Sequence, residues 1–85
     1  IVRAIPFNGF KRQENKMVEV FKTNVDLVEQ SDIICARLLN LFPNLQINFD
    51  LDDCDRILRV QGKMIQVHKI ISELNAIGFA CEVLD

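Results

Sequence analysis

The 85-residue chain has no long apolar run, only one histidine and only three glycines. No stretch approaches the roughly 20 apolar residues that a membrane-spanning helix needs, and residues 1–10 lack the continuous apolar segment of a secretion signal. Neither a Gly-x-Gly-x-x-Gly motif nor a Walker-type phosphate loop is present. We therefore expect a cytoplasmic protein that is not an enzyme, makes no membrane contact and carries no cofactor.

The cysteines are few and widely separated. Cys35, Cys54 and Cys81 are odd in number, which argues against a disulfide framework and for a reducing compartment. We expect Cys35 and Cys81 to be small buried hydrophobes and Cys54, beside a turn, to be exposed. We therefore predict that the chain has no metal site. The alternative is a metal site built on these three cysteines, which would need at least two thiolates to converge.

Composition favours one globular domain. Hydrophobic residues make up 49% of the chain and charged residues 26%, which is typical of a folded rather than a disordered chain. Residues 1–16 hold four basic side chains and one acidic, a charge of +3, so the remaining residues carry −5 of the total of −2. An acidic body is a poor partner for nucleic acid, so we expect no nucleic-acid binding.

The first sixteen residues differ from the rest of the chain. They contain Pro6 and Gly9, show no sustained periodicity and end in a polar run. We interpret residues 1–16 as a leader or linker and residues 17–85 as the domain. A basic arm for a partner or a membrane surface is the alternative for the leader.

Periodicity over residues 17–85 predicts six elements. Alternation predicts strands at 17–22, 45–51, 56–60 and 79–83. Three- and four-residue spacing predicts one helix that begins near Asp26 or Ser31 and ends near Leu41, before Pro43, and a second that ends at Gly78. The order βαββαβ predicts an α+β, ferredoxin-like sandwich: one antiparallel sheet of strand order 4-1-3-2, with both helices on one face.

The alternation also assigns side chains to the two sheet faces. The helix-facing set is expected to be Val18, Val20, Ile47, Phe49, Leu51, Leu58, Val60, Phe79, Cys81 and Val83. Phe21 and Ile57 would then point outward, and polar neighbours including Arg59 would surround them. An apolar centre with a polar rim is typical of an interaction patch. Two other interpretations are an ordinary exposed pair and a cover formed by leader residues Ile5, Phe7 and Phe10.

With this element order, residues 17–84 resemble the heavy-metal-associated domain of metallochaperones and metal-pumping ATPases. Element lengths match throughout, and residues 74–83 (LNAIGFACEV) are similar to the family's helix-Gly-aromatic-strand ending. The family holds its metal with Gly-Met-x-Cys-x-x-Cys after the first strand, and residues 23–30 (TNVDLVEQ) keep none of those residues. The resemblance therefore implies the fold, and it carries over no metal ligand.

Two further groups favour ordinary structural roles. The aspartates at 50, 52, 53 and 55 do not follow a calcium-loop pattern, because Asp55 and Gln61 stand where that loop needs Gly and Glu. We interpret them as a solvated hairpin tip, with an acidic docking surface as the alternative. The single histidine, His68, is expected on the outer side of the second helix.

The function predicted from these residues is a small non-enzymatic interaction or regulatory module on a heavy-metal-associated-like scaffold. It would bind a protein partner, or a second copy of itself, through the open sheet face at Phe21, Ile57 and Arg59. The alternative is a divergent copper or zinc carrier that uses Cys35, Cys54 or Cys81.

Overall fold

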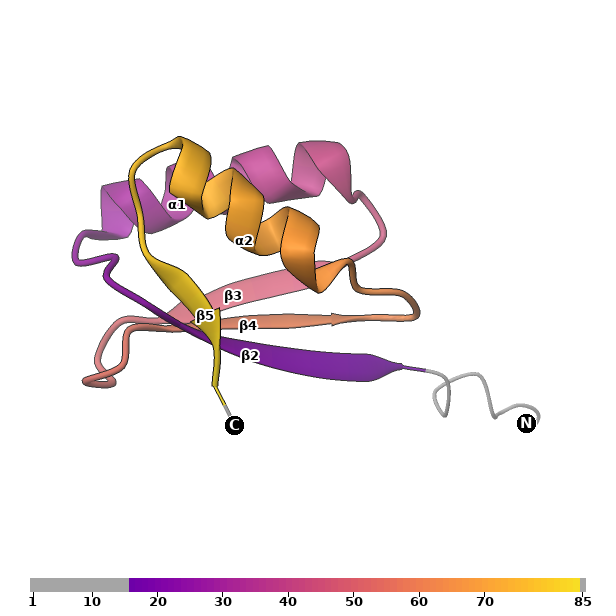
Figure 1. Cartoon of the computed structure of the whole chain (residues 1–85), viewed down its shortest axis with the longest axis horizontal. Helices are drawn as coiled ribbons and strands as arrows, with labels where there is room; N and C mark the ends of the chain where they lie inside the picture. The colour runs from indigo at the N-terminus through magenta and orange to yellow at the C-terminus, as the bar shows by residue number, and fades with distance from the viewer. Residues whose placement is uncertain (1–15, 85) are drawn as a thin grey trace, which may run out of the picture.

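The computed structural model describes residues 16–84. The predicted βαββαβ order is present (Figure 1). The elements are β2 (Met17–Thr23), α1 (Val28–Leu41), β3 (Gln46–Asp50), β4 (Ile57–Gly62), α2 (Val67–Ala76) and β5 (Cys81–Val83). Apart from Lys16, the predicted leader lies outside the described residues, as do its proposed cover residues Ile5, Phe7 and Phe10.

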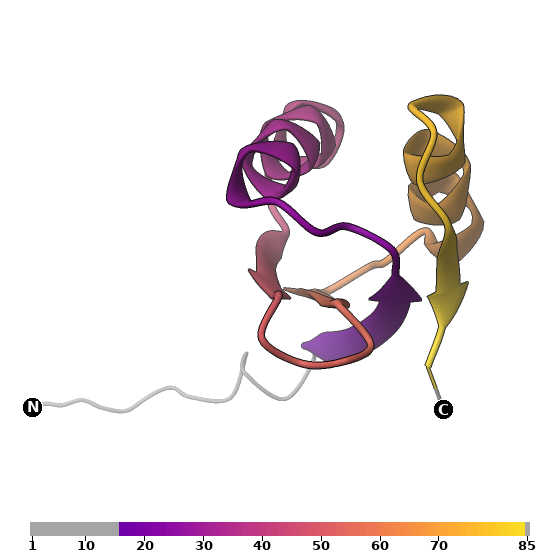
Figure 2. The ribbon, with the colours of Figure 1, turned by 90° about the vertical axis from the view of Figure 1, so that its left-hand side faces the viewer.

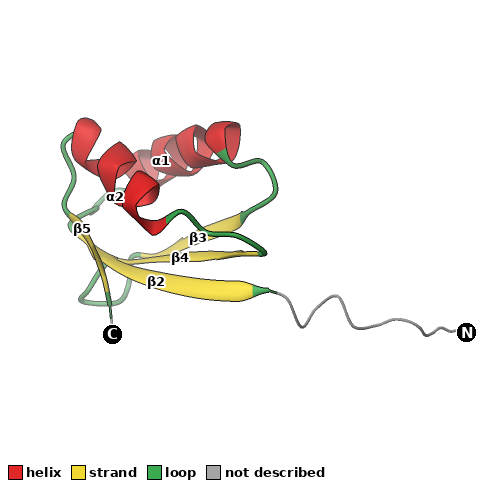
Figure 3. Cartoon of the chain, turned by 45° about the vertical axis from the view of Figure 1, so that its right-hand side comes forward, coloured by secondary structure: helices red, strands yellow, loops and turns green. Residues whose placement is uncertain are grey.

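The four strands form one antiparallel sheet in the order β3-β4-β2-β5. Read from the other edge, this is the predicted order 4-1-3-2, so the fold prediction is confirmed. Both helices cover the same face of the sheet (Figures 1 and 3). Figure 2 shows them side by side above the strands, with the opposite face turned away from them. No helix in residues 16–84 has the length and apolar character needed to cross a membrane.

The core fills the space between the helices and the sheet. Each helix contributes two residues with no exposed surface, Ile34 and Leu38 from α1 and Ile70 and Leu74 from α2. The sheet contributes three such residues, which are Phe21, Leu58 and Val60. Burial of each side chain of this size stabilises the fold by about 1.5–3 kcal/mol. These contacts hold the helices on one face and leave the other face without a layer from the described residues.

The sheet-face assignment of β2 was wrong. Phe21 lies opposite Leu58, and Val20 lies opposite Arg59. Because side chains of directly opposed residues share a face, Phe21 points into the core and Val20 points outward with Arg59. Val18 and Phe21 are both apolar but fall on opposite faces, so the alternation alone did not decide between them. A one-residue change in phase reverses every side chain.

Burial further along the chain decides the phase of β2. Three alternate residues, Phe21, Thr23 and Val25, are all buried. The aromatic side chain fills the core, and the two valines before it take the outer face. Val83 is opposite Phe21 and so faces the helices as predicted, but it is 40% exposed on the short edge strand β5 and does not join the core.

The helix ends are set by local hydrogen bonds. Leu27 is the N-terminal cap residue of α1, one residue after the predicted Asp26. The Gln30 side-chain oxygen accepts hydrogen bonds from the backbone N–H groups of Asp26 and Leu27, at 3.3 and 3.1 Å. The helix therefore begins one residue later than predicted, and Asp26 does not cap it. The Asp26 carboxylate instead lies 3.1 Å from the Arg56 guanidinium.

The end of α2 confirms the prediction for Gly78. This residue has a φ of +94°, a left-handed conformation that glycine adopts without a side-chain penalty. The Phe79 N–H then donates to the Leu74 carbonyl at 2.9 Å, which satisfies one of the last carbonyls of the helix. The chain turns there and enters β5.

Candidate functional site

The strongest candidate is the sheet face that the helices leave uncovered, which we call the outer sheet face. Strand register assigns to it alternate residues of each strand. They are Val18, Val20 and Lys22 from β2, Ile57, Arg59 and Gln61 from β4, Gln46, Asn48 and Asp50 from β3, and Glu82 from β5. No helix or strand among residues 16–84 lies over it (Figures 2 and 3).

Its apolar part runs along the two central strands. Val18 is 50% exposed and Val20 is half-buried. Ile57 is on this face by register but is only 5% exposed, and it does not belong to the core cluster between the sheet and the helices. The accessible apolar surface is therefore centred on Val18 and Val20, and a partner could not reach Phe21, which is fully buried.

The charges on this face have a simple pattern. Arg59 on β4 and Lys22 on β2 are exposed at the centre, whereas Asp50 and Glu82 are exposed on the two edge strands. Among the described residues, no carboxylate lies within 4 Å of the Arg59 guanidinium. Arg59 therefore offers five N–H donors next to Val20, a combination suited to a carboxylate adjoining an apolar side chain.

Of the three predicted interface residues, the structure keeps two on the outer sheet face. Ile57 and Arg59 are there, and the prediction that they bind a partner stays a prediction. Phe21 is on the opposite face and is replaced in this surface by Val18 and Val20. One signal in the sequence could have shown that Val18 and Val20 are exposed. Phe21 is the bulkiest apolar residue of β2, and it lies two and four residues before Thr23 and Val25, which are buried on the same side.

The loops that follow β2, β3 and α2 meet at one end of the sheet and are joined by hydrogen bonds. The Ala80 N–H donates to Asn24 Oδ1 at 2.8 Å, and the Thr23 hydroxyl donates to the Arg56 carbonyl at 2.6 Å. Arg56 has a φ of +47°, and its guanidinium reaches Asp26 at 3.1 Å and the Leu51 carbonyl at 3.0 Å. Residues 23–30, where the resembling family has its clamp, are thus anchored by polar contacts to two neighbouring loops.

The cysteines occupy three separate elements. Cys35 is on α1, Cys81 begins β5, and Cys54 is exposed in the β3–β4 loop. Burial, and secondarily Glu82, raises the pKa of the Cys81 thiol to about 11. Burial, with a smaller contribution from Asp32, also raises the pKa of Cys35. Both thiols are protonated at neutral pH, and metal coordination needs the thiolate.

Within residues 16–84, one group of three potential metal ligands has its ligand atoms close together, namely Asp53, Cys54 and Asp55. The Asp55 N–H donates to Asp53 Oδ1 at 2.8 Å, so one carboxylate already serves the turn. Cys35 and Cys81 join no such group in the described part of the chain. The structure therefore does not gather the three cysteines with further ligands into one site.

Comparisons of this chain with protein-family models, with curated proteins and with solved structures found no match.

Proposed function

We propose that the protein is a non-enzymatic binding module, on a heavy-metal-associated-like scaffold, that binds another protein through the outer sheet face. The observation that carries the proposal is the pairing of Val20 with Arg59 beside half-exposed Val18. An accessible apolar strip with an unpaired guanidinium in the described structure is typical of interface centres, where arginine is enriched.

The same charges define the partner's chemistry. Arg59, which has no ion pair among the described residues, favours a surface that presents a carboxylate beside an aliphatic or aromatic side chain, whereas Lys22 already lies 3.9 Å from Asp55. A second copy of the chain placed face to face about an axis near Arg59 would bring two guanidinium groups together, which costs electrostatic energy. The repulsion between the two guanidinium groups favours a different protein as the partner over a second copy of the chain.

The test compares surface variants in binding experiments. Val18→Glu and Arg59→Glu should each abolish recovery of the partner from cells, because each places a carboxylate opposite the partner's own acidic group. Ile33→Glu is the matched control, since Ile33 is 64% exposed on α1, which lies across the sheet from the outer face. Quantitative mass spectrometry of the bound proteins gives the measurement, and binding is then repeated with the purified partner.

Two results would contradict the proposal. One is a bound partner that Val18→Glu and Arg59→Glu retain but Ile33→Glu loses, which would move the interface to the helical side. The other is the absence of any protein that distinguishes the three variants. Sedimentation velocity of the isolated protein completes the test by measuring its oligomeric state. If the wild-type protein is a dimer and Val18→Glu is a monomer, the occupant of the outer sheet face is a second copy of the chain and not a different protein.

A further inference from the structure

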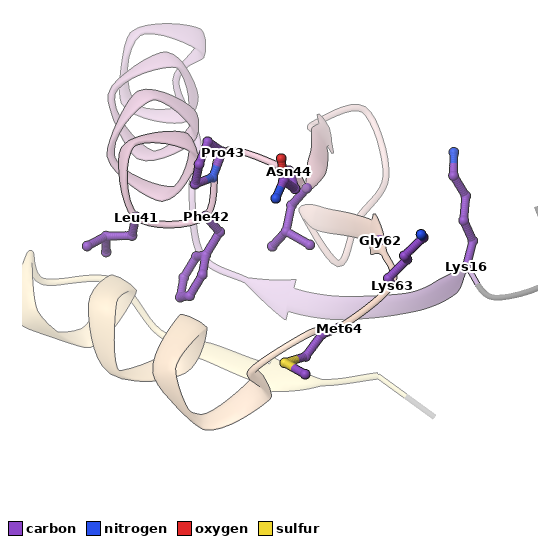
Figure 4. Close-up of a pocket in the computed structure, with 9 residues that line it drawn as sticks. Lys16, Leu41, Phe42, Pro43, Asn44, Gly62, Lys63 and Met64 are labelled. Carbon is purple, nitrogen blue, oxygen red and sulfur yellow. The ribbon is translucent and has the colours of Figure 1, made fainter. Parts of the chain in front are cut away.

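A separate cavity opens at the end of the molecule where α1 finishes and β4 leads towards α2 (Figure 4). Its volume is about 520 Å³, within the range of small-molecule sites. One wall comes from the end of α1 and the turn after it, with Leu41, Phe42 and Pro43, and the other comes from the segment after β4, with Met64. Leu41 and Met64 are 43% and 74% exposed, so the cavity offers apolar surface at its mouth.

The inner wall is formed where β3 approaches the end of β4. Leu45 is buried against Gly62, and a Cβ added at Gly62 would lie 2.4 Å from the Leu45 Cδ2 atom. The missing side chain at position 62 lets Leu45 lie flat against β4. Any larger residue there would force the Leu45 side chain to move. The apolar wall therefore depends on a specific close approach of side chain to backbone.

The cavity is polarised by charge. Lys16 and Lys63 line its strand side, away from the end of α1, as Figure 4 shows. None of its lining residues is acidic. Within residues 16–84, no carboxylate lies within 4 Å of either ammonium group. The C-terminal end of α1, which carries the negative end of the helix dipole, lies at the wall opposite the two lysines. An anion is therefore favoured only beside the lysines.

We propose that this cavity binds a small amphipathic carboxylate, with its hydrocarbon part against Phe42, Leu45 and Met64 and its carboxylate beside Lys63 and Lys16. Burial of the hydrocarbon supplies the affinity. The two ammonium groups select an anion over a neutral molecule of the same length. This site is independent of the outer sheet face, and its occupant is a small molecule and not a protein.

Octanoate is the test ligand and 1-octanol its neutral counterpart of equal chain length. Each is titrated into uniformly nitrogen-15-labelled full-length protein while amide nitrogen–proton correlation spectra are recorded. We expect saturable shifts for octanoate at the amides of Phe42, Gly62, Lys63 and Met64. The dissociation constant for octanoate should rise about two- to five-fold in Lys63→Gln, the range for loss of one exposed charge contact. That for octanol should stay unchanged.

Lys22→Gln is the control, since it removes the same charge from the outer sheet face. It should leave the octanoate constant unchanged, and added salt should weaken octanoate binding but not octanol binding. Four results would overturn the proposal: octanol bound as tightly as octanoate, equal effects of Lys22→Gln and Lys63→Gln, shifts clustered away from Gly62 and Lys63, or no saturable shift below the concentration at which octanoate forms micelles.

Discussion

Replacement of Phe21 tests the corrected face of β2. Phe21 has no exposed surface and lies in register between Leu58 on β4 and Val83 on β5. Truncation of a fully buried phenylalanine to alanine costs about 3–5 kcal/mol, through lost burial and the cavity that remains. A domain of this size is stabilised by about 4–13 kcal/mol in total. We therefore expect Phe21→Ala to lose a large part of its free energy of unfolding.

The assay is urea unfolding followed by circular dichroism at 222 nm, because the chain has no tryptophan or tyrosine for fluorescence. With a urea dependence of about 1 kcal/mol per molar, Phe21→Ala should lower the unfolding midpoint by about 3 M or more. Phe21→Leu provides a milder variant if the alanine protein does not fold. It keeps most of the side-chain volume and should lower the midpoint by about 1 M.

Val18→Ala is the control within the same strand. Val18 is half exposed on the outer sheet face, so its truncation should cost less than about 1 kcal/mol. The inward orientation of Phe21 would be refuted if Val18→Ala cost as much free energy of unfolding as Phe21→Ala, or if both Phe21 variants unfolded at the wild-type urea concentration. Either result would favour the opposite orientation of β2, in which Val18 and Val20 face the helices and Phe21 points outward.

Four further predictions concern other parts of the fold. Gly78→Ala should destabilise the protein by about 1–2 kcal/mol in urea unfolding, since the φ of +94° strains any side chain even though a Cβ would meet nothing within 4 Å. Cys54 should react with iodoacetamide at pH 8 faster than Cys81, as peptide mass spectrometry would show, because Cys54 is exposed and the Cys81 pKa is about 11. The raised folded pKa also means that wild-type stability falls between about pH 9 and 11, and Cys81→Ser should make that fall smaller, leaving the part that Cys35 contributes through its own raised pKa. Arg37→Gln should cost less than about 1 kcal/mol, because its 2.7 Å ion pair with Glu73 is partly exposed, and 1 M salt should abolish the difference.

The topology was predictable because it depends on features that local sequence expresses. The alternation at 45–51 gives β3, and Pro43 and Gly78 end the two helices where the structure ends them. Once the order of elements is known, right-handed crossovers leave few sheet topologies. The strand order and the helix-covered face follow from these local patterns.

The outer sheet face was harder to predict because both faces of β2 carry apolar residues. The alternation alone could not show whether Phe21 or Val18 faces the helices. The answer depends on contacts with α1 and α2 that are distant in sequence. The role of Gln30 was missed because α1 is capped at Leu27, one residue later than predicted, which makes Gln30 the residue whose side chain reaches back. The Asp26 carboxylate instead lies 3.1 Å from the Arg56 guanidinium, a contact that is distant in sequence. Ile57 shows a further limit of alternation, because it lies on the outer face by register and is nevertheless buried.

Site-specific photo-crosslinking tests the proposed binding surface most directly. A photoreactive phenylalanine analogue is placed at Val18 in one protein and at Ile33 in another, on opposite sides of the sheet and at similar exposure. On irradiation in cells, the protein modified at Val18 should form one discrete adduct with a partner, and Arg59→Glu in the same chain should remove it. An adduct formed equally from Ile33, or none from Val18, would contradict the assignment of the outer sheet face as the binding surface.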